Sequence, residues 1–394
     1  MRISGYDGKN ICSHALQKAS VWGILQNMEE KKKIYDLIVI GGGAGGLAAA
    51  VTAAKRGKKV IILEKEDKLG KKILVSGNGK CNLGNLTVSA DKYNAAMTEN
   101  VIKRDITAFF ASLGLATKTA EDRIYPYSES ALAVLNALRK NYSGEAETGV
   151  FVKEIAERDG LFICEGKRGR NVLLATGSAA TKGTESAFLY EKFGHSATPF
   201  YPSLVPLRTD TAYIKGLSGL RAKCAVKLMK NGVFLAESRG EILFRDNGIS
   251  GIAAMSLSTF IARERGKGDF SVSVDFVPDR TESEVSAFSD GFGAESFLQK
   301  AIAQNVEKQA RERRVSVSAA IKDFRIGNVS CGDMKQAQVA CGGLCTDEFD
   351  ENLQSKIKKG LYACGEVLDV DGECGGFNLH FAFASGIRVG ESVC

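Results

Sequence analysis

The chain has 394 residues, of which 44% are hydrophobic and 25% charged, so it is long enough for two or three domains with a large core. Its net charge of +7 comes from 53 basic and 46 acidic side chains. These are scattered, which argues against dedicated nucleic-acid binding. The sequence lacks an apolar run of about 18 residues, so we expect no membrane span. Its ten cysteines form no C-x-x-C pair and no zinc spacing, which indicates no metal and a reducing cytoplasm.

The first residues do not resemble a targeting sequence, because they contain no contiguous apolar core of the signal-peptide kind. Met28 opens a charged run that leads directly into the first expected strand. We therefore favour Met28 over Met1 as the start of translation. Residues 1–33 are interpreted as an N-terminal extension that the fold does not need.

A glycine motif follows the first expected strand. Residues 38–40 are apolar and β-branched, which predicts a parallel strand covered on both faces. The pattern Gly41-x-Gly43-x-x-Gly46 then predicts a tight turn whose bare backbone approaches a pyrophosphate. The Ala-rich segment 44–56 predicts a helix that directs its positive N-terminal end at the phosphates.

A second strand, expected at 60–63, ends at Glu64, where a carboxylate can accept hydrogen bonds from both ribose hydroxyls. A glycine turn alone is weak evidence and also occurs in purely structural βαβ units. Here the strand, helix, second strand and acid fall at the required spacing, so the sequence favours a dinucleotide site.

Further elements follow from periodicity and turn residues. Gly77 and Gly79 around Asn78 permit close approach to a ligand. Up to about residue 198 we expect helices at 100–114 and 128–140 and strands at 149–156, 160–165 and 172–176. Beyond it we expect a β-rich insert with strands at 204–209, 222–229, 232–237, 240–244 and 270–277 and helical segments at 250–264 and 281–320.

The C-terminal segment carries a second signature. An apolar strand from residue 360 is followed by Gly365 and Glu366, and Gly375-Gly376 opens a last helix at 378–393. Such a helix start can approach the flavin pyrimidine edge, where reduction builds negative charge. A glycine-bounded helix start is the simpler interpretation of this segment alone. Together with the N-terminal motif it indicates FAD bound in the glutathione-reductase manner.

The chain resembles the YhiN-like or BaiN-like flavoproteins, also called aminoacetone-oxidase-like, a family of two-dinucleotide-binding-domain flavoproteins. The resemblance is carried by five blocks at 40–50, 72–83, 125–131, 201–207 and 365–379. It implies an α/β fold with a Rossmann-like FAD-binding domain, an inserted β-barrel-like domain and a smaller helical region over the flavin. The expected units are 34–195 and 334–394 for the FAD-binding domain and 196–333 for the insert.

The same resemblance and the motifs above assign the residues that bind FAD. At the adenosine and pyrophosphate end they are Gly41, Gly43, Ala44, Gly46, Glu64, Lys65 and Val152. Near the ribityl chain and the isoalloxazine ring they are Ser76, Gly77, Asn78, Gly79, Cys81, Asn82, Ala175, Thr176 and Gly177. The C-terminal set comprises Gly365, Glu366, Asp369, Gly376, Phe377, Asn378 and Leu379.

Two departures from the family pattern concern the expected substrate face. After Gly177 the family has a longer glycine-rich segment, and His380-Phe381 stand where Gln and Trp are expected. No residue is assigned as catalytic, and three are weak candidates. Cys81 could be redox-active or only packed, His380 could be an acid or only a structural histidine, and Tyr125 could cover a ligand or belong to the core.

The sequence therefore predicts an FAD-dependent oxidoreductase that transfers a hydride at flavin N5 to or from a small organic molecule. The family suggests amine oxidation, or NAD(P)H-driven reduction of an activated double bond such as that of a dehydro-bile acid. No second dinucleotide motif is present, so NADH or NADPH would dock only transiently. The alternative is a flavin-binding module that works through a macromolecular partner. The sequence does not define the oligomeric state.

Overall fold

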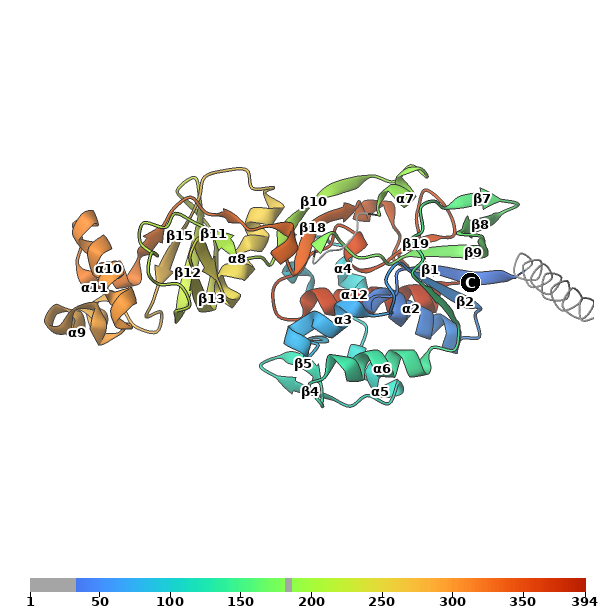
Figure 1. Cartoon of the computed structure of the whole chain (residues 1–394), viewed down its shortest axis with the longest axis horizontal. Coiled ribbons are helices and arrows are strands. Elements are labelled where there is room, and N and C mark those ends of the chain that lie inside the picture. Colours follow the sequence, from blue (N-terminus) through green and yellow to red (C-terminus); the bar gives the residue numbers. More distant parts are fainter. Residues whose placement is uncertain (1–32, 181–185) are drawn as a thin grey trace, which may run out of the picture.

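The computed structural model describes residues 33–180 and 186–394, so the expected start at Met28 and nearly all of the 1–33 extension lie outside the described residues. Figure 1 shows an elongated molecule. A unit built on a parallel sheet lies at one end, a β-rich unit in the middle and a group of helices at the other end. Within the described part of the chain, every helix is too short or too polar to cross a lipid bilayer.

The first unit is built on a mainly parallel sheet with the strand order β6-β2-β1-β9, and β19 pairs with β9. Ile38 on β1 lies between Ile61 and Val172 on its two neighbours. Both faces of these strands are covered, so their apolar side chains form the core. The parallel strands are β1 (Ile34–Ile40), β2 (Val60–Glu64), β6 (Glu145–Thr148), β9 (Lys167–Leu174) and β19 (Leu361–Ala363).

The strand expected at 149–156 is wrong in its extent. Only β7 (Ala156–Arg158) is a strand there, and it pairs antiparallel with β8 (Leu161–Cys164). The backbone N–H of Val150 donates to Glu64 O, and the N–H of Lys153 donates to the side chain of Glu165. These partners belong to no single neighbouring strand, so a ladder does not form.

The two sequence signatures meet where α2 (Ala44–Lys55) packs against α12 (Phe377–Ser392). A Cβ atom at Gly386 would lie 2.2 Å from Gly45 O, and one at Gly390 would lie 2.6 Å from Ala49 O. The two helix backbones therefore touch directly, which requires glycine at both positions. This packing fixes the C-terminal helix against the dinucleotide turn.

Short elements cover the other side of this unit. The helix expected at 100–114 is wrong as one element, because Asp105 caps a new helix by accepting hydrogen bonds from the N–H groups of Thr107 and Ala108. The helices are α3 (Lys71–Val75), α4 (Thr98–Val101), α5 (Ile106–Ser112), α6 (Ala131–Asn141) and α7 (Phe188–Glu191). A small antiparallel sheet contains β3 (Gly84–Asn85), β4 (Thr117–Ala120) and β5 (Arg123–Pro126).

The insert is joined to the first unit through the antiparallel pair β10 (Ala197–Ser203) and β18 (Val339–Leu344). Its sheet has the order β16-β15-β12-β13-β14-β11-β17. The strands are β11 (Leu207–Arg208), β12 (Arg221–Lys230), β13 (Val233–Arg245), β14 (Gly248–Ser250), β15 (Phe270–Asp275), β16 (Phe324–Ile326) and β17 (Ser330–Cys331), and α8 (Ile252–Arg263) packs against them.

Two expected features of the insert are corrected. The strands expected at 232–237 and 240–244 are the single strand β13, because Gly240 stays paired with Cys224 and the ladder runs through it. The strand expected at 204–209 is reduced to β11.

The helical segment expected at 281–320 is three helices, α9 (Glu282–Phe292), α10 (Lys300–Arg313) and α11 (Val317–Lys322). Gly293 follows α9 with a φ of 68°, and Arg314 ends α10 in the left-handed conformation. Figure 1 shows these helices at the outer end of the insert, far from α2 and α12. The helical region over the flavin that the resemblance implies stays a prediction.

Candidate functional site

The glycine turn between β1 and α2 has little room except at its middle position. A Cβ atom at Gly41 would lie 2.5 Å from Ala175 O, and one at Gly46 would lie 2.0 Å from Gly41 O. At Gly43 no atom lies within 4 Å of such a Cβ. Gly43 also precedes α2 without a side-chain cap. An open backbone next to an uncapped helix N-terminus fits the pyrophosphate of a dinucleotide.

Glu64 lies at the end of β2 beside this turn and is 8% exposed. One carboxylate oxygen accepts a hydrogen bond from the backbone N–H of Gly42 at 2.6 Å, and the other accepts from that of Glu66 at 2.8 Å. These two bonds fix the carboxylate plane. Each oxygen keeps acceptor capacity for a ribose hydroxyl.

A second acid, Glu366, is held between two segments of the FAD unit. Lys72 Nζ lies 2.7 Å from Glu366 Oε2, and Ser178 Oγ donates to the same oxygen at 3.3 Å. A Cβ atom at Gly177 would lie 3.8 Å from it. The structure thus brings together three segments that the sequence analysis placed along the cofactor, and it adds Lys72 and Ser178 to them.

The segment from Ser76 to Gly79 forms an exposed left-handed turn, with φ values of 55° at Gly77 and 54° at Asn78. Cys81 follows it and is fully buried. Burial raises the pKa of the Cys81 thiol to about 11. Cys81 is therefore a protonated packing residue at neutral pH, the simpler of its two interpretations.

The N-terminal end of α12 lies against Asn82. A Cβ atom at Gly376 would lie 2.7 Å from Asn82 Oδ1 and 2.6 Å from Gly84 O. Asn82 Oδ1 is buried and has no hydrogen-bond partner among the described residues. No side chain caps α12 either. An unpaired acceptor beside free helix N–H donors matches a flavin pyrimidine edge, which has an N–H between two carbonyls, so the residues present fit FAD.

Other residues assigned to FAD have clear structural partners. Asn378 accepts a hydrogen bond from the N–H of Gly372 and donates to Gly372 O, both at 2.8 Å, so its amide supports the preceding loop. Phe377 is buried edge-to-face with Tyr93. Thr176 Oγ1 hydrogen-bonds Ser186 Oγ. The backbone of Ala175 continues from β9, Lys65 follows β2, and Val152 is buried. Ala44 and Gly365 begin helical turns, and Leu379 lies in the first turn of α12.

The remaining candidates, His380 and Tyr125, lie on adjoining segments, because Gly84 pairs with Ile124 and a Cβ at Gly84 would lie 2.6 Å from His380 Nδ1. His380 is buried and we assign its Nε2 proton to the hydrogen bond with Ile102 O at 3.0 Å, while Nδ1 has no partner among the described residues. Burial lowers the pKa of His380, so the ring is neutral. Tyr125 is half-buried on β5 opposite Lys118. The bond to Ile102 favours a structural role for His380, and the role of Tyr125 stays open.

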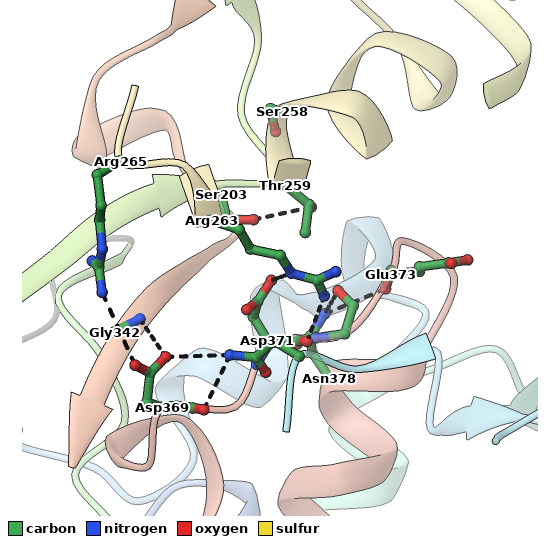
Figure 2. Close-up of polar contacts among 12 residues, drawn as sticks. Ser203, Ser258, Thr259, Arg263, Arg265, Gly342, Asp369, Asp371, Glu373 and Asn378 are labelled. Atoms are coloured by element: carbon green, nitrogen blue, oxygen red, sulfur yellow. Dashed lines mark hydrogen bonds and ion pairs between the residues drawn. The ribbon is translucent and has the colours of Figure 1, made fainter. Parts of the chain in front are cut away.

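Asp369 lies at the junction of the two units rather than free toward a cofactor. Its carboxylate accepts hydrogen bonds from Thr198 Oγ1 at 2.6 Å, from the N–H of Gly342 at 3.0 Å and from Asn94 Nδ2 at 3.3 Å. Arg265 Nη2 lies 4.0 Å away. Figure 2 shows Arg265 directed at Asp369 across β18. These bonds tie the strand pair β10–β18 to the C-terminal loop.

Asp371, two residues further, is fully buried beside Arg263 of α8. Arg263 Nε lies 3.4 Å from Asp371 Oδ2, and Arg263 Nη2 donates to Asp371 O at 3.1 Å. Neither carboxylate oxygen has a hydrogen-bond partner among the described residues. Burial raises the pKa of Asp371, against the pull of the Arg263 charge. We call Arg263, Arg265, Asp369 and Asp371 the junction cluster (Figure 2).

The sequence analysis missed three members of the junction cluster. Arg263 ends the apolar helix α8 and Arg265 follows it, and neither was assigned a role from the sequence. Asp371 lies within the fifth family block but was not assigned a role. A buried carboxylate facing a basic residue more than a hundred positions away gives no local signal, because only the fold brings the two together.

The family model described as the HI0933-like protein Rossmann domain matches residues 35–392. The chain belongs to the HI0933-like family. This confirms the resemblance to the YhiN-like and BaiN-like flavoproteins and the Rossmann-like FAD fold. The protein is an FAD-dependent oxidoreductase.

Relatives and a solved structure match most of the chain. It is 33% identical to the 3-dehydro-bile acid delta(4,6)-reductase of Clostridium scindens over 374 residues, which cover 84% of this chain and 91% of that protein. It is 25% identical to the ribosomal RNA dihydrouridine synthase of Haemophilus influenzae over 377 residues, 84% and 92% of the two chains. The 3-ketosteroid delta1-dehydrogenase of Sterolibacterium denitrificans, solved with 1,4-androstadiene-3,17-dione, shares the fold with 12% identity, a TM-score of 0.50 and coverage of 91% and 99%.

Proposed function

We propose that this FAD-dependent oxidoreductase reduces a carbon–carbon double bond that is conjugated to a carbonyl group. The observation that carries the proposal is the similarity to the Clostridium scindens delta(4,6)-reductase over 91% of that protein. The match covers 84% of this chain, so it includes part of the insert as well as of the FAD unit. The similarity is therefore not confined to cofactor-binding motifs.

The two named relatives share one chemical feature in their substrates. A 3-dehydro-bile acid with 4,6 double bonds carries a dienone, and a uracil ring has its C5–C6 double bond conjugated to a carbonyl. In both, the carbon distant from the carbonyl is electrophilic and accepts hydride. The higher identity to the bile acid reductase favours a steroid-like small molecule for this chain.

Separate groups of residues would hold the adenosine and the flavin ends of FAD. Gly43 and the N-terminus of α2 would hold the pyrophosphate, Glu64 the ribose and Glu366 the ribityl chain. Asn82 and the N-terminus of α12 would bind the pyrimidine edge, and these N–H dipoles stabilise negative charge there. When bound, FAD supplies a hydride at N5. The protein contributes orientation and electrostatic stabilisation around it.

We infer that NADH or NADPH is the electron donor and docks transiently. An anaerobic titration of the holoprotein tests this, with absorbance followed during addition of each nicotinamide. Bleaching of the flavin bands by NADH or NADPH, followed by recovery on addition of a 4,6-dien-3-one bile acid, is the expected result. Bleaching by a primary amine but by neither nicotinamide would overturn the proposal and favour amine oxidation.

A second substrate class is favoured by the match to a ribosomal RNA dihydrouridine synthase over 92% of that protein. The same reaction would then occur on a uridine of RNA, which corresponds to the macromolecular alternative. Reduced protein is offered either the dienone or ribosomal RNA that lacks dihydrouridine. Flavin reoxidation by the RNA alone, with dihydrouridine in the product, would replace the steroid-like substrate by RNA.

A further inference from the structure

We propose that Arg263 binds the carbonyl oxygen of the substrate and that Asp371 is the positioning residue that holds its guanidinium group. This inference rests on the proposed function, because it assigns the part of the site that recognises the carbonyl. It concerns residues of the insert and of the C-terminal loop, which lie outside the glycine motifs.

The junction cluster lies next to the expected flavin end of the molecule. Asp371 belongs to the loop that leads into Gly376 and α12, and Gly372 of that loop is bonded to Asn378 in the first turn of the helix. Arg263 reaches this loop from the last turn of α8. Figure 2 shows the Arg263 side chain extended from α8 toward Asp371, beside Asn378. Arg263 thus connects the insert with the helix start that fits FAD.

The guanidinium group of Arg263 is oriented on one side and accessible on another. Its Nε and Nη2 atoms contact Asp371, and its Cζ lies 5.9 Å from the centroid of the Phe260 ring. The side chain is 27% exposed. Nη1 of Arg263 forms no hydrogen bond with a described residue. A planar, oriented cation with donors left over suits a carbonyl oxygen.

Asp371 differs from an ordinary structural acid. The carboxylate of Asp369 is satisfied by three donors, whereas neither oxygen of Asp371 has a hydrogen bond within the described chain. Burying a carboxyl group without hydrogen bonds costs stability, and a well-packed apolar pair would hold the units together at lower cost. The fully buried Asp371 therefore has its best explanation in orienting Arg263.

The chemical step needs this orientation. Hydride adds to the carbon distant from the carbonyl, a new C–H bond forms, and the electron pair of the double bond moves onto the carbonyl oxygen as an enolate. An N–H of Arg263 stabilises that oxygen, where negative charge develops. A proton from water then adds to the carbon next to the carbonyl. The nicotinamide supplies the two electrons.

The test measures ligand binding to oxidised holoprotein through the change in the flavin spectrum. The probes are a 4,6-dien-3-one bile acid, the same steroid without its 3-oxo group, and cyclohex-2-enone. The variants are R263M, R263K and D371N. Matched controls are R265M, which removes the other arginine of the junction cluster, and R239M, which removes an exposed arginine paired with Glu237.

We expect R263M to weaken binding of the dienone by roughly tenfold or more, the effect of losing a hydrogen bond from a charged donor, and to leave the 3-deoxy steroid unaffected. R263K should recover part of the loss and D371N should show a smaller loss, each specific to the oxo group. R265M and R239M should bind both steroids as the wild type does. A merely structural arginine would change the affinity for both steroids alike.

The outcomes separate this inference from the proposed function. Oxo-specific loss in R263M, in a protein that binds the dienone but does not reduce it, supports the inference and overturns the proposed function. Dienone reduction by the wild type, with R263M equal to R239M in binding, overturns the inference alone. A wild-type flavin spectrum that responds to neither the dienone nor cyclohex-2-enone overturns both.

Discussion

The glycine turn and the junction cluster differ in which part of the chain forms the site, the backbone or the side chains. In the turn the backbone itself forms the site, and side chains are excluded by contacts as short as the 2.0 Å that a Cβ at Gly46 would make. In the junction cluster side chains form the proposed carbonyl site: Arg263 from the insert and Asp371 from the C-terminal loop, whose buried carboxyl group has no hydrogen-bond partner among the described residues. Of the three motif glycines in the turn, only Gly43 has room for a side chain, whereas the junction cluster is sensitive mainly to changes of charge.

Under the proposed function, this difference follows from what each region would bind. A pyrophosphate is the same in every dinucleotide, so a rigid backbone with a helix N-terminus is sufficient. A substrate varies from one enzyme to another, and side chains on an inserted unit can vary without disturbing the cofactor fold. Substitutions in the two regions test this difference.

The largest effect is expected for G46A. The added methyl group would meet Gly41 O at 2.0 Å and Ala175 Cβ at 3.2 Å, so the turn, β9 and α2 must separate. We expect a loss of about 3 kcal/mol or more in the free energy of unfolding, at the upper end of overpacking effects. Thermal unfolding of the apoprotein measures it. A variant as stable as the wild type would show that the turn is less tightly packed than described.

G43A is the matched substitution within the same turn. No atom lies within 4 Å of a Cβ at Gly43, and its φ of −81° suits alanine, so the unfolding free energy should stay within about 1 kcal/mol of the wild type. The methyl group would occupy the space expected for the pyrophosphate. FAD affinity should fall roughly ten- to hundredfold, measured by fluorescence titration. Unchanged FAD affinity would contradict the assignment of the turn.

D371N tests the junction cluster through pH. Burial raises the pKa of Asp371, which faces Arg263 of α8, Cys341 of β18 and Asp369. The folded protein thus keeps a proton that the unfolded chain releases near pH 4, and wild-type stability falls as pH rises through the interval between the two pKa values. The destabilisation caused by D371N should therefore be larger at about pH 4 than at about pH 7.

Denaturant unfolding of the wild type and D371N across this range is the measurement. A destabilisation that instead grows with pH would mean that the charge of Arg263 outweighs burial and lowers the pKa of Asp371 in the folded protein. D333N, which alters the exposed ion pair of Asp333 with Arg208, is a control for general effects of removing a carboxylate.

Much of the FAD unit could be predicted from the sequence because its signals are local. The strand, turn, helix and acid from residue 34 to Glu64 lie within one short segment, and each has a residue type that its geometry requires. The predicted ends of helices and strands were wrong in two places. A single capping residue, Asp105, begins a new helix, and the segment before Ala156 has no neighbouring strand to pair with.

The site was harder to predict than the fold. Glu366 was expected near the cofactor, but its contacts with Lys72 and Ser178 join three distant segments. Asp369 was assigned to the cofactor because it lies in the fifth family block, but its hydrogen-bond partners come from β10, β18 and Asn94. Long-range pairing of this kind leaves no periodicity in the sequence, so residue type alone could not separate a cofactor ligand from a junction residue.

The smallest effect is expected for H380Q, on the helix that both regions share. The neutral His380 donates to Ile102 O at 3.0 Å, and a glutamine amide can make the same bond, so the variant should lose about 1 kcal/mol or less of stability. Its kcat should remain within about threefold of the wild type, because a proton-transferring residue would contribute about a hundredfold or more. Steady-state assays at pH 6, 7 and 8 would decide: a large loss of kcat together with a changed pH profile would make His380 the acid of the reaction, and the carbonyl would then be activated from α12 rather than from the junction cluster.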